Sequence, residues 1–237
     1  MDLRKIFSDN IFEFRSHIID DMIKCGIPFE TIDRIAIDCS DIEDILFVLK
    51  DVKIKRILEV GAYAGFSTLV FRIAFPEASI ISIDPNFVID ADVPGNNRNK
   101  LHVRSIFDTI VSKYDLKLIF RYNAYFSCLP QEESLRFHRD YNDNIMDIPI
   151  IDDDTISQNG KYDFIFIDAD HYAKSVYSDL MKSKDYLADE GLILLHDMEG
   201  KWGQEVKNGI HQFLFDNTEY SFREVNNIGV INRRNLL

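Results

Sequence analysis

The sequence lacks the features of several protein classes. Its 237 residues include only three cysteines, Cys25, Cys39 and Cys128, and this odd number at wide spacing disfavours a disulfide framework or a zinc site. No run of about 18 apolar residues occurs, so we expect no membrane-spanning helix. The first residues have mixed charge and no apolar core, which argues against a secretion signal. These absences predict a cytoplasmic protein with reduced cysteines.

Basic residues are also scarce. The chain has 27 lysines and arginines against 40 aspartates and glutamates, a formal net charge of −13. Binding to nucleic acid or to anionic membranes depends on clustered basic side chains, so we expect neither as a partner. Because 46% of the residues are hydrophobic, the composition excludes an intrinsically disordered chain.

Residues 1–50 have the apolar spacing of helices. One helical pattern covers residues 11–22 and a second covers residues 42–49, where Asp41 can cap the start. No residue pattern in this segment suggests chemistry. We therefore predict an N-terminal helical cap over 1–50, with substrate contact or a homodimer surface as its alternative roles.

Short apolar runs alternate with helical patterns from residue 54 onward. The runs cover residues 57–60, 80–83, 116–120, 164–167 and 192–195. Continuous apolar runs of this length are typical of strands that are buried on both faces of a parallel sheet. Helical patterns begin near Gly65 and cover residues 172–187. This alternation predicts an α/β doubly wound fold over residues 51–237.

The C-terminal end has a different pattern. A helical stretch at 206–215 precedes two short runs, 220–225 and 229–232, with Asn226 and Asn227 between them. A connection this short predicts an antiparallel hairpin. The sheet should therefore be mostly parallel, with an antiparallel strand at its C-terminal end.

An acidic stretch at residues 130–160 interrupts the alternation. It contains Glu132, Glu133, Asp140, Asp143, Asp147, Asp152, Asp153 and Asp154. Loops of this length in compact domains are usually functional or disordered. We predict an insertion that forms a surface excursion or a lid.

The strongest chemical signal is a glycine motif where the first predicted strand ends. It reads Leu58-Glu59-Val60-Gly61-Ala62-Tyr63-Ala64-Gly65-Phe66-Ser67. Glycine lets the backbone turn sharply and approach a ligand closely, and the following helix directs its free N–H groups at that ligand. A dinucleotide-binding fold would carry G-x-G-x-x-G, whereas this spacing is G-x-x-x-G. An ordinary tight turn is the alternative.

The second predicted strand ends at Asp84. An acidic residue at this position can accept hydrogen bonds from ribose hydroxyls. Asp84 follows Gly61 by 23 positions, close to the usual spacing of about 20. A solvent-exposed carboxylate without a ligand is the alternative.

Acidic residues and histidines follow the last two parallel strands. Asp168-Ala169-Asp170-His171 follows one strand, and His196-Asp197 follows the next. Ligands bind outside the carboxyl ends of strands in such sheets. Oxygen ligands from Asp168 and Asp197 suit Mg²⁺, and His196 extends the choice to Mn²⁺ or Fe²⁺. The alternative is that these acids cap helices and bind no metal.

Together these motifs resemble the class I S-adenosylmethionine-dependent O-methyltransferases. They are most similar to the cation-dependent catechol and caffeoyl-coenzyme A type and to related bacterial enzymes acting on sugars and antibiotics. The resemblance covers about residues 50–235 and implies a Rossmann-like sheet of seven strands. It also implies S-adenosylmethionine as the cofactor and a small-molecule or sugar hydroxyl as the methyl acceptor.

The resemblance assigns roles to residues of this chain. Cofactor contacts fall at Glu59, Gly61, Ala62, Tyr63, Gly65, Ser67, Asp84, Asn123, Ala124 and Asp168. Metal ligands fall at Asp168 and Asp197 with His196 beside them, and Asp170 or His171 would be the general base. Two other interpretations stay open. One is a metal-free methyltransferase with a His/Asp base, and the other is a non-catalytic subunit that binds the cofactor.

Overall fold

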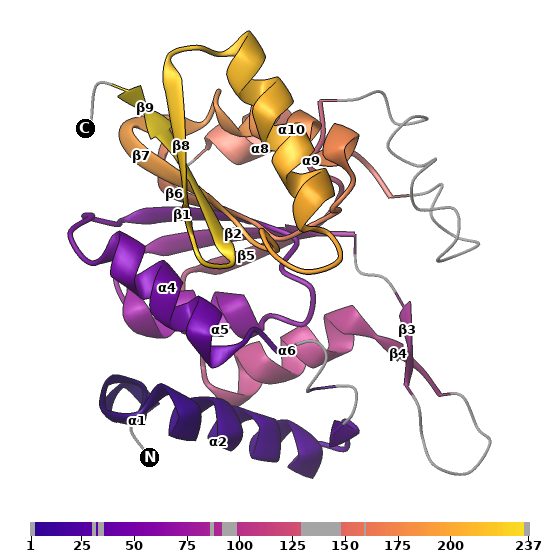
Figure 1. The fold of residues 1–237 in the computed structure, drawn as a ribbon. Coiled ribbons are helices and arrows are strands. Elements are labelled where there is room, and N and C mark those ends of the chain that lie inside the picture. The colour runs from indigo at the N-terminus through magenta and orange to yellow at the C-terminus, as the bar shows by residue number, and fades with distance from the viewer. Residues whose placement is uncertain are drawn as a thin grey trace.

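A seven-stranded sheet forms the centre of the molecule in a computed structural model that describes residues 3–29, 32, 36–85, 88–91, 99–128, 148–158 and 160–234 (Figure 1). The strand order is β5-β2-β1-β6-β7-β9-β8. The strands are β1 (Arg56–Val60), β2 (Ser79–Asp84), β5 (Ile119–Asn123), β6 (Tyr162–Ile167), β7 (Leu187–Leu195), β8 (Tyr220–Val225) and β9 (Ile228–Arg233). All neighbours pair in parallel except β9, which is antiparallel to both β7 and β8. The expected doubly wound α/β sheet and its C-terminal hairpin are thus confirmed.

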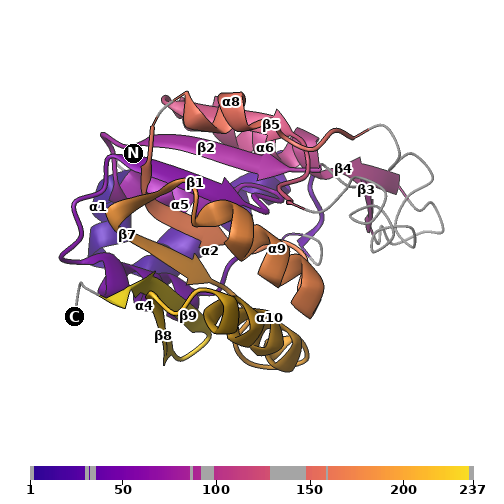
Figure 2. The same cartoon turned by 90° about the horizontal axis from the view of Figure 1, so that it is seen from above.

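Helices cover both faces of this sheet (Figures 1 and 2). One face carries α1 (Leu3–Asp9), α2 (Ile11–Lys24), α4 (Cys39–Leu49), α5 (Phe66–Ala74) and α6 (Val103–Lys113). The other carries α8 (Asp153–Ser157), α9 (Ala173–Ser183) and α10 (Gly203–Asp216). The central strands are buried by both layers, which explains their continuous apolar runs. A separate antiparallel pair, β3 (Val88–Ala91) and β4 (Asn99–His102), projects beyond this body (Figure 2).

The N-terminal helices pack on the same apolar layer as α5 and α6. Phe14, Ile18 and Met22 of α2 are buried there, as the helical spacing predicts. The prediction that Asp41 caps the next helix is wrong, because α4 begins two residues earlier, at Cys39. Cys39 is buried in the core, so the apolar face of α4 extends a turn further toward its start than its isoleucines and leucines indicate. Asp41 consequently lies inside the first turn, where its side chain can contact another element.

Two further segments differ from expectation. The apolar pattern predicts the third parallel strand at 116–120, but the strand is observed at Ile119–Asn123, because Leu118 adopts a left-handed backbone (φ +61°) that cannot continue a strand. Of the acidic insertion, residues 130–147 and 159 lie outside the described residues. The remainder includes α8, and Ile151 and Ile156 are buried there.

No helix of the described residues combines the length and the apolar character that a membrane crossing requires.

Candidate functional site

The glycine motif forms a tight loop between β1 and α5, here called the Gly61 loop (residues 61–65). Gly61 has a left-handed backbone (φ +86°), and its N–H donates a 2.8 Å hydrogen bond to the Ile83 carbonyl. A Cβ at Gly61 would lie 1.9 Å from the Asp168 carbonyl oxygen, much closer than any real contact. Gly65 is also left-handed (φ +88°) and precedes α5 directly. Both positions therefore require glycine, and Gly61 brings this loop against the end of β6.

Glu59 lies beneath the Gly61 loop and is fully buried. Its carboxylate accepts hydrogen bonds from the hydroxyls of Ser67 (2.6 Å), Thr68 (2.5 Å) and Ser82 (2.6 Å). Burial raises the pKa of Glu59, and the three hydroxyl donors oppose that rise. Glu59 thus joins β1, β2 and the start of α5. Ser67 and Glu59 are hydrogen-bonded to each other in this structure. Direct contact of either residue with the cofactor stays a prediction.

Asp84 lies at the end of β2, as predicted, but it is buried rather than open to solvent. Its Oδ2 accepts a 2.8 Å hydrogen bond from the Tyr63 amide, and its Oδ1 lies 3.3 Å from Arg121 Nη2. Arg121 also donates to the Tyr63 carbonyl (2.9 Å) and stacks on Phe107. Sequence reasoning missed Arg121. A charged residue within a strand beside Asp84 was the available signal, but the predicted strand stops at Phe120.

The residues after β5 lie next to Asp84. Asn123 pairs with Asp84 across the two strands, although its side chain lies outside the described residues. The Ala124 amide lies 3.3 Å from the Asp84 carbonyl oxygen, to which it donates a hydrogen bond, and the Ala124 side chain is buried. The expected adenine-contacting segment therefore borders the expected ribose-binding carboxylate.

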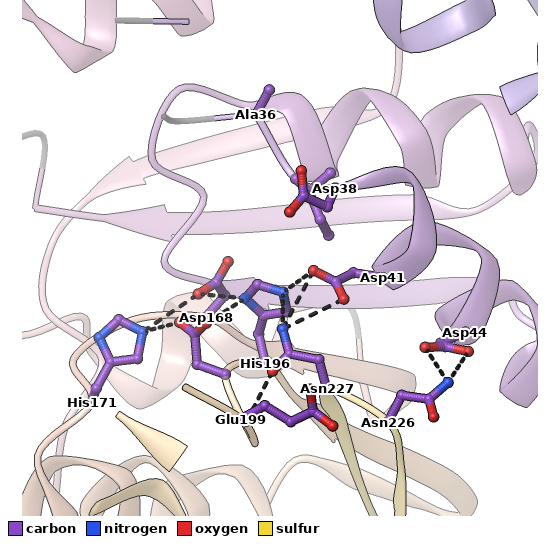
Figure 3. Close-up of polar contacts among 12 residues, drawn as sticks. Ala36, Asp38, Asp41, Asp44, Asp168, His171, His196, Glu199, Asn226 and Asn227 are labelled. Carbon is purple, nitrogen blue, oxygen red and sulfur yellow. Dashed lines mark hydrogen bonds and ion pairs between the residues drawn. The ribbon is translucent and has the colours of Figure 1, made fainter. Parts of the chain in front are cut away.

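Asp168 and His171, which follow β6, and His196, which follows β7, lie together at one edge of the sheet (Figure 3). Ligand atoms of Asp168, His171 and Asp197 all lie within 4.8 Å of one another. His171 Nε2 is 2.5 Å from Asp197 Oδ2 and 3.8 Å from Asp168 Oδ1. His196 Nδ1 lies 3.5 Å from Oδ1 of each aspartate. The structure thus gathers all three predicted metal ligands together with His171.

Opposite charges on the histidines and aspartates stabilise this cluster. Burial alone would lower the pKa of both histidines, but the charges and hydrogen bonds of Asp168 and Asp197 raise it, to about 9 for His171 and about 12 for His196. Burial would raise the pKa of each aspartate, and the two histidines lower it instead. In the absence of another cation, the histidines therefore neutralise the two carboxylates.

Asp170 has a different environment. Its carboxylate accepts hydrogen bonds from Ser175 Oγ (2.6 Å) and from the Tyr172 amide (3.4 Å), at the start of α9. His171 instead contacts both Asp168 and Asp197 and stacks on Trp202, with ring centroids 5.5 Å apart. Of the two residues expected as general base, His171 is the one in the cluster. Trp202 carried no sequence signal, because it joins the cluster through tertiary packing.

Solved structures with this fold come from several organisms. An SAH-bound methyltransferase from Podospora anserina, PaMTH1, is 16% identical with a TM-score of 0.55, over 93% of this chain and 88% of that one. An O-methyltransferase from Bacillus cereus in complex with SAH is 10% identical, with a TM-score of 0.56 and coverage of 92% and 90%. The O-methyltransferase TomG from Streptomyces achromogenes, involved in tomaymycin synthesis and in complex with SAM, is 10% identical, with a TM-score of 0.52 and coverage of 84% and 81%.

No curated protein sequence matches the chain. A family model described as a methyltransferase domain, Methyltransf_24, matches residues 58–198. That match begins in β1, includes the Gly61 loop and Asp84, and ends just after Asp197. It covers more than half of the sequence and spans the cluster at the sheet edge. The chain belongs to the Methyltransf_24 family of methyltransferase domains.

Proposed function

We propose that the chain transfers a methyl group from S-adenosylmethionine to a hydroxyl oxygen of a small molecule or sugar, with the help of a divalent cation. The observation that carries this proposal is the convergence of Asp168, His171, His196 and Asp197 beside the Gly61 loop. A donor site and a site that can activate a hydroxyl thereby share one edge of the sheet.

The donor would bind over the Gly61 loop and Asp84. The left-handed glycine keeps this loop free of side-chain bulk where the backbone must approach a ligand. Each oxygen of the Asp84 carboxylate can accept more than one hydrogen bond, so ribose hydroxyls can share it with the Tyr63 amide. The O-methyltransferases from Bacillus cereus and Streptomyces achromogenes, solved with SAH and SAM, support this class of donor.

The donor set at the cluster fits a divalent cation. Neighbouring ligands of an ion bound at about 2.1 Å lie roughly 3 Å apart in octahedral geometry. His196 Nδ1 lies 3.5 Å from one oxygen of Asp168 and 3.5 Å from one oxygen of Asp197. This nitrogen is buried and lacks a hydrogen bond of good geometry among the described residues. Asp168, Asp197 and His196 would hold the ion, with Mg²⁺, Mn²⁺ or Fe²⁺ as the choices.

His171 is our candidate for the general base. Its Nε2 lies 2.5 Å from Asp197, too close for two neighbouring ligands of one ion, and it has no hydrogen bond of good geometry among the described residues. When bound, S-adenosylmethionine supplies the methyl group and the cation lowers the pKa of the acceptor hydroxyl. His171 would accept the hydroxyl proton. Stacking on Trp202 holds its ring in place.

A metal-free reaction is the second candidate. The raised pKa values of His171 and His196 indicate that the cluster already contains its own counter-charges. With no cation present, the two imidazolium groups offset the two carboxylates. In that case one histidine, after losing its proton, would activate the acceptor without a metal.

Turnover with and without chelation distinguishes these candidates. The assay measures methyl transfer to a panel of vicinal diols, catechols and sugars, because a diol can chelate a cation. We expect EDTA to lower turnover strongly, added Mg²⁺ or Mn²⁺ to restore it, and donor affinity to change little. Full activity after exhaustive chelation would leave the metal-free reaction. If no acceptor is methylated while the donor still binds, the chain is a non-catalytic cofactor-binding subunit.

A further inference from the structure

The N-terminal cap reaches the candidate site through one buried carboxylate. Asp41, in the first turn of α4, has an oxygen 2.8 Å from Nε2 of His196. The two side chains are only 10% and 13% exposed, although 155 residues separate them in sequence. Figure 3 shows Asp41 on one side of the His196 ring and Asp168 on the other. The ring therefore lies between the cap and the proposed cation site.

Asn227, in the turn of the C-terminal hairpin, contacts both Asp41 and His196. Asn227 Nδ2 lies 3.4 Å from both oxygens of Asp41 and 3.3 Å from His196 Nε2. Its Oδ1 accepts a hydrogen bond from the Glu199 amide (3.0 Å), so its NH₂ group faces Asp41. The Met198 amide donates to its carbonyl oxygen (3.2 Å). The Glu199 amide thus orients the side chain of Asn227, and the Met198 amide holds its main chain.

The chemistry of these groups decides where the hydrogen on His196 lies. An ionised carboxylate only accepts hydrogen bonds, so Nε2 must carry the hydrogen that it shares with Asp41. The other nitrogen, Nδ1, then faces Asp168 and Asp197. A histidine with one N–H held by a carboxylate presents its other nitrogen in a fixed orientation, the usual arrangement behind a metal-binding histidine.

We propose that Asp41 is a positioning residue of the methyl-transfer site, which makes the N-terminal cap a working part of that site. Asp41 holds the His196 ring with Nε2–H toward α4 and Nδ1 toward Asp168 and Asp197. The proposal rests on the proposed function, because it assigns these two carboxylates to the reaction. It concerns the orientation of His196, which can be measured without any substrate.

The consequence of removing Asp41 follows from Asn227. In Asp41→Ala, the polar group that remains beside Nε2 within the described part of the chain is the Asn227 NH₂, which can donate but cannot accept. In the neutral ring, which is the form that the proposed ion requires, Nε2 then becomes the acceptor and the hydrogen moves to Nδ1, facing the two aspartates. This change places a hydrogen where the proposed ion would bind. Loss of such a supporting partner typically lowers metal affinity or activity by about 10–100-fold.

A matched control lies one turn along the same helix. Asp44 accepts two 3.0 Å contacts from Asn226, so it also ties α4 to the hairpin turn. Its partner is Asn226, whereas the partner of His196 on α4 is Asp41. Asp44→Ala therefore removes a comparable tether between the cap and the hairpin but leaves the histidine in place.

The test combines nitrogen NMR of ¹⁵N-histidine-labelled protein with turnover. The spectra are recorded with Mg²⁺ bound, because the raised pKa of His196 keeps both ring nitrogens protonated in the metal-free protein. In the wild type and in Asp44→Ala, we expect Nε2 of His196 to carry the hydrogen and turnover to agree within about twofold. In Asp41→Ala, the signals should show the hydrogen on Nδ1, with turnover about 10–100-fold lower at unchanged donor affinity. Asp41→Asn keeps an acceptor and the shape of the side chain, so it should retain the Nε2 hydrogen and lose less turnover.

Unchanged His196 signals in Asp41→Ala would overturn the proposal, as would equal losses in Asp41→Ala and Asp44→Ala. If Asp41→Ala does not fold, Asp41→Asn decides, because its neutral amide oxygen is a weaker acceptor for Nε2–H than a carboxylate. Wild-type turnover in Asp41→Asn would then overturn the proposal. A wild-type protein that methylates no acceptor would defeat the proposed function instead, and the nitrogen spectra would still report whether Asp41 sets the ring.

Discussion

Replacement of Gly61 by alanine tests whether the Gly61 loop packs directly against the backbone at the end of β6. An added Cβ would lie 1.9 Å from the Asp168 carbonyl oxygen and 2.8 Å from the Ala169 Cα. Both atoms belong to the backbone, so no side-chain rotation relieves the overlap. The loop, the end of β6 or both must move by more than about 1 Å to restore an ordinary contact.

The chain offers a control with the same backbone strain and no overlap. Gly26 has φ +88°, close to the +86° of Gly61, but a Cβ added at Gly26 would meet no described atom within 4 Å. Gly26→Ala should therefore lose only the cost of a left-handed alanine, about 1–2 kcal/mol, which lowers Tm by roughly 2–8 °C in a domain of this size. Gly61→Ala adds the backbone overlap, and we expect a total loss above about 3 kcal/mol.

Thermal and urea unfolding of the two variants measure this difference. Donor affinity is the second measurement, because the shift in Gly61→Ala moves the loop that would hold the donor. We expect weaker binding in Gly61→Ala and unchanged binding in Gly26→Ala. If the two variants lose equal stability and bind the donor equally, the close approach of Gly61 to Asp168 is wrong.

Three further changes have expected outcomes. Asp84→Asn keeps an acceptor for the Tyr63 amide but loses the carboxylate, so calorimetry should show donor binding weaker by about 1–3 kcal/mol; unchanged binding would place the ribose elsewhere. Glu59→Ala leaves three buried hydroxyls without their acceptor and should cost about 3 kcal/mol or more of unfolding free energy, whereas a loss under about 1 kcal/mol would contradict the bracing role. The pKa of His171 is about 9 in the folded protein and 6.5 in the unfolded chain. In metal-free protein its contribution to the free energy of unfolding, at most about 3 kcal/mol, is therefore complete below pH 6.5 and is lost as pH rises through 9. Urea unfolding from pH 6 to 10 should show this decline, and His171→Gln should flatten it.

The sheet was predictable because its central strands are buried on both faces. Phe164 and Leu194 lie in runs without polar interruption, and such runs identify strands directly, whereas the run of Ile57 contains one polar residue, the buried Glu59. The edge strand β5 was harder to place, because it carries Arg121 and Asn123 instead of a continuous apolar run. The pattern therefore placed this strand three residues too early.

The candidate site was predictable where its residues follow strands. Parallel strands end at one edge, so Asp84, Asp168 and Asp197 could be placed together from topology alone. Asp41 could not be found this way, because its contact with His196 depends on how α4 packs against the sheet. Its sequence neighbours indicate only a helix start, and helix patterns carry no information on partners 155 residues away.

Calorimetric titration of the metal-free and the Mg²⁺-loaded chain with S-adenosylmethionine, beside NAD as the comparison ligand, tests the central claim most directly. We expect micromolar affinity, about −8 kcal/mol, for S-adenosylmethionine in both forms, because the Gly61 loop and Asp84 would form the donor site with or without the ion. NAD should give no binding heat, because the G-x-x-x-G spacing departs from the dinucleotide motif. Absence of heat with S-adenosylmethionine, or tight binding of NAD, would contradict the account.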